Sequence, residues 1–167
     1  MNATFVRTFF NRFGLRAIVM GAVLAAPTMT AERASAQGAG ISGAGISKVG
    51  RDTRKLTVTA QTPAGSSTAS GTVQFIHNSP AGLSRFRGSV TCLSVNGGTA
   101  QISGVIEKGE TATGALLDGK SYAFTINSAG SPQSFSLPTV GEAGAVGACS
   151  GGRGETVPVT EEGFKFR

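Results

Sequence analysis

Two runs of strand-forming residues on either side of Asn96-Gly97-Gly98 constrain the fold of this chain more than any other feature. Asn-Gly is the strongest short signal for a β-hairpin, because a tight reversal needs residues that tolerate positive φ. In the second run one face is expected to carry Ala100, Ile102, Gly104 and Ile106. This period of two is typical of a half-buried strand. Residues 85–108 are therefore predicted to form a long central hairpin.

The same alternation recurs along the chain between turn signals such as Asp118-Gly119. We expect further strands at 55–61, 71–77, 120–127, 133–137 and 157–166. In the first three the inward residues are expected to be Leu56, Val58 and Ala60, then Val73 and Phe75, then Tyr122, Phe124 and Ile126. No segment has a sustained helical period. Seven or eight short strands at roughly ten-residue spacing predict an all-β fold, a single antiparallel sandwich or small barrel. The pattern does not choose between sandwich and barrel.

Residues 1–36 have the features of a secretory signal peptide. Three arginines precede the apolar run 17–26, which is too short to span a bilayer, since a span takes about 20 residues. Ala34-Ser35-Ala36 fits a signal-peptidase site, so we expect cleavage before Gln37, or earlier, after Ala31. The alternative is an N-terminus that stays uncut and anchored. The predicted location is secreted, periplasmic or extracellular, with no stable membrane span after processing.

The remaining chain is predicted to be one domain preceded by a Gly-rich segment. Residues 37–54 repeat the unit G-A-G-I-S and are expected to be a flexible linker or a weak first strand. Residues 51–55, at the boundary between the two segments, are interpreted as a charged turn, and the cations there, Arg54 included, as a solvated edge rather than a site. Residues 55–167 are predicted to be the all-β domain.

Net charge gives little support for a nucleic-acid partner. The whole chain carries +6, but four of the arginines lie in residues 1–36. Without that segment, eleven basic and eight acidic residues remain, a net charge of +3. We expect no nucleic-acid binding. Partners are otherwise unknown, an envelope or extracellular component being the class to look for.

Cys92 and Cys149 are the whole cysteine inventory of the chain. An even count in an exported protein predicts a disulfide. Closing a loop of about 58 residues contributes roughly 4 kcal/mol in the chain-entropy model. Because residues two apart in a strand point together, Cys92 is expected on the same face as Val90. A metal pair or a catalytic thiol are the rival interpretations.

The segment 70–132 resembles a known group of proteins. The strings G-T-V-Q-F-I-H-N-S-P-A-G-L and F-R-G-S-V-T-C-L-S-V-N-G-G-T-A-Q-I-S-G-V-I are similar to small secreted bacterial all-β domains of the post-COAP type. The resemblance implies an exported all-β fold and no established activity. Members usually carry an acidic turn where this chain has Asn127 to Pro132, which keeps Asn, Gly and Pro without the acids. A cation-binding role for that turn is not expected here.

Candidate site residues are few. His77 is the only histidine, and neither a nucleophile elbow nor a phosphate loop accompanies it. Arg85 and Arg87 alternate along one strand and form a small cationic edge, which either binds an anionic ligand or protects an edge strand from aggregation. No catalytic, metal or cofactor residue is assigned.

The sequence is compatible with two functions. The first is a secreted, non-enzymatic interaction or structural module. The alternative is a small-ligand-binding barrel or sandwich, lipocalin-like in role. It is motivated by glycines inside strands, Gly71, Gly88 and Gly104, that leave interior room.

Overall fold

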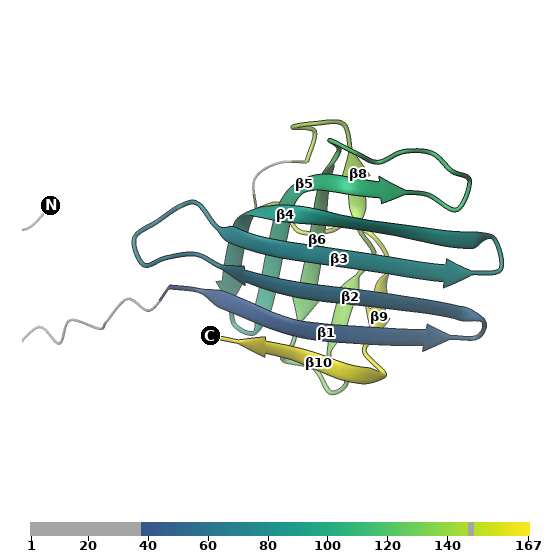
Figure 1. The fold of residues 1–167 in the computed structure, drawn as a ribbon. Coiled ribbons are helices and arrows are strands. Elements are labelled where there is room, and N and C mark those ends of the chain that lie inside the picture. Colours follow the sequence, from purple (N-terminus) through teal and green to yellow (C-terminus); the bar gives the residue numbers. More distant parts are fainter. Residues whose placement is uncertain (1–37, 147–148) are drawn as a thin grey trace, which may run out of the picture. The chain divides into compact units, whose positions relative to one another are not determined.

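The computed structural model describes residues 38–146 and 149–167, and these residues form an all-β fold, as predicted (Figure 1). The predicted signal peptide lies outside them, and the described residues include no helix with the length and apolar character of a membrane span. Ten antiparallel strands form one sheet in the order β10-β1-β2-β3-β4-β5-β6-β7-β9, with β8 also paired to β6. The strands are β1 (Gly40–Val49), β2 (Asp52–Gln61), β3 (Ser70–Ser79), β4 (Gly82–Asn96), β5 (Thr99–Glu110), β6 (Ser121–Asn127), β7 (Ser134–Ser136), β8 (Thr139–Gly141), β9 (Thr156–Pro158) and β10 (Glu161–Phe166).

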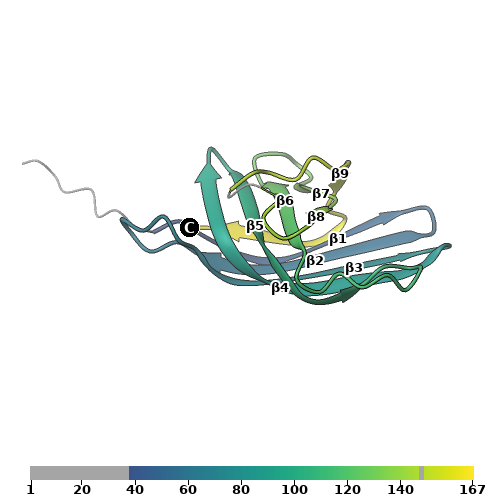
Figure 2. The same cartoon turned by 90° about the horizontal axis from the view of Figure 1, so that it is seen from above.

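The sheet is strongly curled into a half-barrel. Seen from above, β1 to β3 and the first part of β4 form a shallow arc, and the end of β4 bends away from it together with β5 toward the layer of β6 to β9 (Figure 2). The β4–β5 hairpin, predicted from Asn-Gly, contains two register shifts, one between Arg87 and Gly88 and one between Val90 and Cys92. Bulges of this kind bend a strand and increase its twist. The central hairpin therefore belongs to both layers.

Ten strands replace the seven or eight expected, for three local reasons. The first is β8, a three-residue strand after the predicted strand 133–137 that pairs with β6. The glycine-rich segment 37–54 contains β1, which is paired with β2 on one edge and β10 on the other. The predicted strand 157–166 is divided in two, because the backbone N–H of Val159 bonds to Gln133 while that of Thr160 bonds to Ile46. At this point the chain passes from β9, at one end of the strand order, to β10 at the other.

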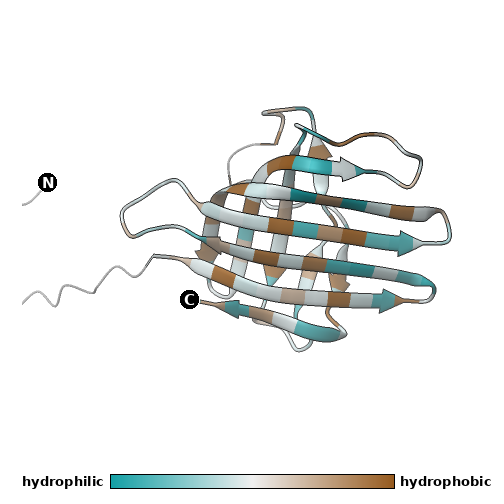
Figure 3. Cartoon of the chain, viewed as in Figure 1, coloured by the Kyte–Doolittle hydropathy of each residue, from teal (hydrophilic) through white to brown (hydrophobic). Residues whose placement is uncertain are grey.

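The core lies on the concave side of the sheet. Along the strands, apolar residues recur as bands separated by paler residues (Figure 3). The inward faces predicted for β2, β3, β5 and β6 are confirmed by burial. At the centre the rings of Phe86 and Tyr122 lie 5.5 Å apart and those of Phe75 and Phe124 5.7 Å apart. Offset aromatic contacts of this kind add to the stabilisation from buried area.

The disulfide between Cys92 and Cys149 is present, with the two Cα atoms 5.1 Å apart. The expectation that Cys92 shares a face with Val90 is wrong. Val90 pairs with Gly104 whereas Cys92 pairs with Ser103, so Thr91 is an extra residue that moves Cys92 to the opposite face. The same shift returns Leu93 to the core, where it pairs with Ile102.

The outward position of Cys92 explains how the C-terminal segment is attached. The backbone N–H of Cys149 donates to Ser103 Oγ at 3.0 Å, and Thr125 Oγ1 donates to the carbonyl of Gly152 at 3.3 Å. Ser103 and Thr125 lie on the outer face of β5 and β6. The segment around Cys149 therefore covers that face, and Ala123 on β6 is fully buried although it points away from the core.

Candidate functional site: a pocket on the concave face

A row of polar residues crosses the concave face beside the aromatic core. Ser47, Arg54, His77 and Ser84 are direct neighbours on β1, β2, β3 and β4. They continue the inward positions of Leu56 on β2 and of Phe75 on β3, since residues two apart in a strand share a face. The row is therefore part of the interior of the half-barrel and marks the point where the apolar core ends.

Arg54 is buried, so the expectation that the cations of 51–55 are solvated is wrong for this residue. Arg54 is 8% exposed, and one of its terminal nitrogens bonds to Asp52 Oδ2 at 2.8 Å. The same carboxylate oxygen lies 3.4 Å from Nε2 of His77. Among the described residues, Nε of Arg54 and Oγ of Ser47 are buried and lack a hydrogen-bond partner. Buried polar atoms without partners are uncommon, and they single out this row.

Sequence reasoning missed Asp52, Arg54 and Ser84. The signal was present, because Arg54 lies in phase with Leu56, Val58 and Ala60 on an otherwise apolar face. A charged residue in that phase is a candidate for burial with a partner. This alternation was not recognised, because the run of charged residues at 51–55 also fits an exposed turn.

A pocket of about 290 Å³ opens at the end of this row that is formed by His77 and Ser84. Its floor comes from β3 and β4, and its other wall comes from the loop after β5 and from the link between β7 and β8. The polar lining consists of His77 and Ser84 on the floor, with Arg85 and Thr111 also contributing, and the apolar lining consists of Phe75, Phe86, Leu117, Leu137, Pro138 and Val140. An apolar pocket with a few convergent polar groups is the usual form of a small-molecule site, and this volume is at the lower end of that range.

Ser84, His77 and Asp52 follow one another in the order of a Ser-His-Asp triad, but their bonds are not those of a triad. Ser84 Oγ accepts a hydrogen bond from the backbone N–H of Ala112 at 2.9 Å. No hydrogen bond joins Ser84 to His77 among the described residues. An activated serine needs a base within hydrogen-bond reach of its hydroxyl. The arrangement is therefore suited to binding through His77 and Ser84 rather than to nucleophilic attack.

The side chains of the other two sequence candidates, Arg85 and Arg87, point away from that of His77, although Arg85 also lines the pocket. These arginines occupy the opposite phase of the sheet and point to its convex face. Arg85 lies 3.0 Å from Glu110, and Arg87 lies 3.8 Å from Glu107. Both side chains are largely exposed, and each positive charge has an acidic partner. The expectation that they protect an edge strand is wrong, because β4 is paired with β3 on one side and with β5 on the other at these residues. Solvated ion pairs on the convex face explain the two arginines better than an anion site does.

Near these arginines, Lys108 and Asp118 form an ion pair in which the pKa of the carboxyl group is shifted. The backbone N–H of Gly109 donates to Asp118 at 2.9 Å, and the Lys108 ammonium lies 3.0 Å from it. The Gly109 bond, followed by the Lys108 bond, lowers the pKa of Asp118 below its ordinary value. These bonds fix the turn that covers the outer edge of β5.

The interior room expected at strand glycines is filled. A Cβ atom on Gly88 would lie 2.8 Å from the ring of Tyr122, and one on Gly104 would lie 2.8 Å from its hydroxyl oxygen. The Tyr122 hydroxyl donates to the carbonyl of Ser89 at 3.0 Å. Burial, reinforced by the charge of Glu107, raises the pKa of Tyr122 well above its ordinary value. At Gly71 the backbone of Thr59 and Ala60 occupies the space. The space beside these glycines is therefore occupied by the Tyr122 ring and by the backbone of neighbouring strands, and it is not free for a ligand.

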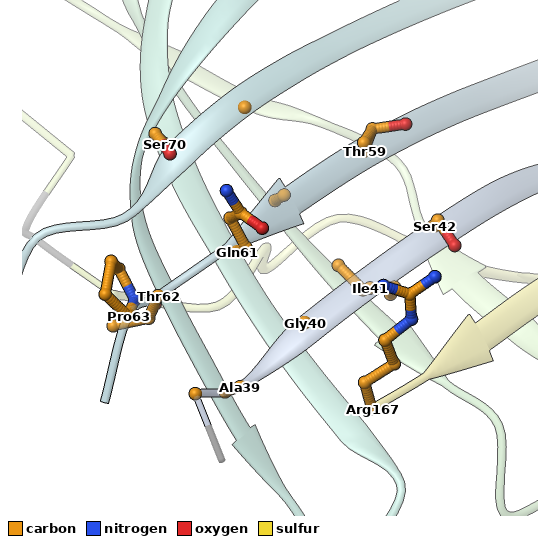
Figure 4. A pocket seen from close by; sticks show the side chains of 13 residues that line it. Ala39, Gly40, Ile41, Ser42, Thr59, Gln61, Thr62, Pro63, Ser70 and Arg167 are labelled. Carbon is orange, nitrogen blue, oxygen red and sulfur yellow. The ribbon is translucent and has the colours of Figure 1, made fainter.

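A larger groove of about 500 Å³ lies where β1 begins (Figure 4). Its polar lining comes from neighbouring strands and the end of the sequence, and includes Ser42, Thr59, Gln61, Ser70 and Arg167. Figure 4 shows these side chains spread along the strands, with no common point toward which they converge. Although this groove is larger than the concave pocket, it lacks convergent polar groups and is the weaker candidate for a ligand site.

Within residues 38–146 and 149–167, no three His, Cys, Asp or Glu side chains are grouped closely enough to hold a metal ion. No family model, curated protein or solved structure matches this chain.

Proposed function

We propose that this protein is an exported bacterial, non-enzymatic β-domain that serves as an interaction or structural module outside the cytoplasm. The observation that carries the proposal is the Cys92–Cys149 disulfide. Structural disulfides persist in oxidising compartments, which agrees with the signal-peptide pattern of residues 1–36. The resemblance of residues 70–132 to secreted post-COAP-type domains supports the same conclusion.

The construction of the domain suits a scaffold. The disulfide joins the central hairpin to residues 141–154, in which Val146 is the only large apolar residue. Both edges of β1 are paired, and a segment held by Cys149 covers the outer face of β6. A rigid sheet that presents loops and a charged convex face is a common way to position a binding surface.

Export is tested by following the full chain in a bacterial host. We expect cleavage before Gln37, recovery outside the cytoplasm and no alkylatable thiol in the native mature protein. Val19→Arg, which interrupts the apolar run of residues 17–26, is the matched control and should leave an uncleaved, reduced protein in the cytoplasm. Recovery of uncleaved wild-type protein with free thiols from the cytoplasm would contradict the proposal.

The non-enzymatic part has a separate test. The mature protein is incubated with a broad panel of ester, peptide and glycoside substrates beside His77→Ala. We expect no turnover by either protein. Turnover by the wild type that His77→Ala abolishes would assign catalysis to the row of Asp52, His77 and Ser84, and the module proposal would fail. Pull-down of envelope and extracellular fractions with the mature protein then searches for the partner.

A second candidate function, small-ligand binding, is favoured by the concave pocket of about 290 Å³ beside buried polar atoms that lack partners. Its test is a thermal-shift screen of the mature protein against small apolar and polar compounds. A ligand present at 100 times its Kd adds about 2.7 kcal/mol to the free energy of unfolding, which such a screen detects readily.

A further inference from the structure

His77 and Ser84 together present a donor and an acceptor to the concave pocket. They are directly paired across β3 and β4, so their side chains lie side by side on the same face. In a neutral imidazole one ring nitrogen donates and the other accepts. When Nε2–H donates to Asp52 at 3.4 Å, Nδ1 becomes the acceptor. Ser84 Oγ accepts from the N–H of Ala112, which leaves its own O–H free to donate.

A hydroxyl group is the complement of this pair. A hydroxyl both donates and accepts, so one such group donates to Nδ1 of His77 and accepts from Ser84. A carbonyl oxygen accepts only, and it would leave Nδ1 without a donor. Since an unpaired buried polar group is costly, the pair discriminates in favour of the hydroxyl.

The charges around the pocket favour an uncharged ligand. The charged groups next to the pocket floor are Asp52, at 3.4 Å from His77, and Arg54, whose side chain is 10% exposed. The two are 2.8 Å apart and neutralise each other, so neither is available as a counter-ion. Arg85, which also lines the pocket, lies 3.0 Å from Glu110 and already has an acidic partner. A charged head group would therefore lose its hydration without gaining an unpaired group of opposite charge.

We infer that the concave pocket binds a small, uncharged, mainly apolar molecule that carries one hydroxyl group, held between His77 and Ser84 with its apolar part against Phe75, Leu117, Leu137 and Val140. The inference rests on the second proposed function and names the chemical class of its ligand. The apolar lining supplies most of the binding free energy, and the two polar groups fix the orientation.

The experiment titrates the mature protein with octanol, octanoate and octylamine, which share one apolar chain and differ in head group. Binding is followed by calorimetry and by the shift of the melting temperature. We expect octanol to bind and to raise the melting temperature, and both charged analogues to bind at least tenfold more weakly. Equal binding of all three compounds, or tighter binding of a charged one, would overturn the assigned chemistry.

Variants locate the site. His77→Phe removes the acceptor and is expected to weaken octanol binding by roughly three- to tenfold, the effect of one hydrogen bond. Gln74→Ala, an exposed residue on the convex face of the same strand, is the control and should bind as wild type does. Leu117→Trp fills the pocket from the loop and should abolish binding while the circular dichroism spectrum stays that of a folded sheet.

Unchanged octanol affinity in both His77→Phe and Leu117→Trp would place binding elsewhere and overturn the inference. Absence of octanol binding to the folded wild type would overturn it as well. The thermal-shift screen keeps this failure distinguishable from that of the second proposed function: stabilisation by another compound without octanol binding would overturn only the assigned ligand class, whereas no stabilisation by any compound would count against ligand binding as a whole.

Discussion

The side-chain amide of Gln133 bonds to both backbone polar groups of Phe164. Gln133 Oε1 accepts the N–H of Phe164 at 2.7 Å, and Nε2 donates to its carbonyl at 3.1 Å. Gln133 precedes β7, whereas Phe164 lies in β10, and the two strands lie near opposite ends of the strand order. The side chain of Gln133 thus pairs with Phe164 as the backbone of a further strand residue would. It joins β10 to the segment before β7, between which no strand ladder runs within residues 38–146 and 149–167.

Gln133→Leu should loosen this junction. The substitution keeps the size of the side chain but removes two hydrogen bonds and leaves two backbone groups of Phe164 unpaired, so we expect a loss of about 1–3 kcal/mol in the free energy of unfolding. Urea denaturation measures it, with Gln74→Leu on the exposed convex face as control. Amide exchange should rise first in β10, and a stability equal to that of wild type would show that packing alone holds β10.

The disulfide prediction concerns where stability is lost as well as how much. Cys149→Ser opens a cross-link spanning 57 positions, for which the chain-entropy model gives roughly 4 kcal/mol. We expect a lower melting temperature and faster amide exchange in β6, because the segment around Cys149 covers its outer face. The double variant Cys92→Ser/Cys149→Ser controls for the free thiol and should behave alike. Exchange that rises first in β2 and β3 would contradict this picture.

The fold class followed from local patterns. Period-two alternation located the inward faces of β2, β3, β5 and β6, and Asn96-Gly97 located the central hairpin. The face of Cys92 did not follow, because an extra residue such as Thr91 changes no composition and leaves no short-range signal. A bulge is recognised only when the pairing of both strands is known.

The candidate site was predictable only in part. His77 was identified as the single histidine, but its neighbours Asp52 and Ser84 come from other strands, and strand register is a non-local property. The glycines were noticed for the room they leave, yet the residue that fills it, Tyr122, comes from β6. Strand order, which no short pattern encodes, decides both outcomes.

Gly104 and Gly40 provide a matched pair of glycine substitutions. A Cβ on Gly104 would lie 2.8 Å from the Tyr122 hydroxyl oxygen and would also collide with the Ser89 carbonyl. On Gly40 the nearest atom would be 3.6 Å away, an ordinary contact. Gly104→Ala should therefore lower the free energy of unfolding by about 1–3 kcal/mol, whereas Gly40→Ala should be neutral or slightly stabilising. Equal effects in urea denaturation would mean that Tyr122 does not occupy this space.

Tyr122 supplies a spectroscopic test of the core, because it is the only tyrosine in a chain without tryptophan. It is fully buried, and its hydroxyl donates to Ser89. Burial first, and then the charge of Glu107, raises its pKa in the folded state. The unfolded chain ionises near the ordinary value of about 10. The phenolate band should therefore stay absent above pH of about 10 for as long as the sheet is intact.

The sign of the linked stability change follows. Above pH of about 10 the unfolded state has released the Tyr122 proton and the folded state has not, so stability contributed by neutral Tyr122 is complete below that pH and declines as the pH rises toward the raised pKa. Absorbance and circular dichroism recorded together should show the phenolate appearing with unfolding. Tyr122→Phe keeps the aromatic ring but has no phenol to ionise. Lysines also titrate in this pH range, but they are the same in both proteins, so the variant should lose stability less steeply with pH than wild type does. A phenolate that forms reversibly near the ordinary pKa in a folded sheet would show that Tyr122 is accessible to water and that the room beside Gly88 and Gly104 is open.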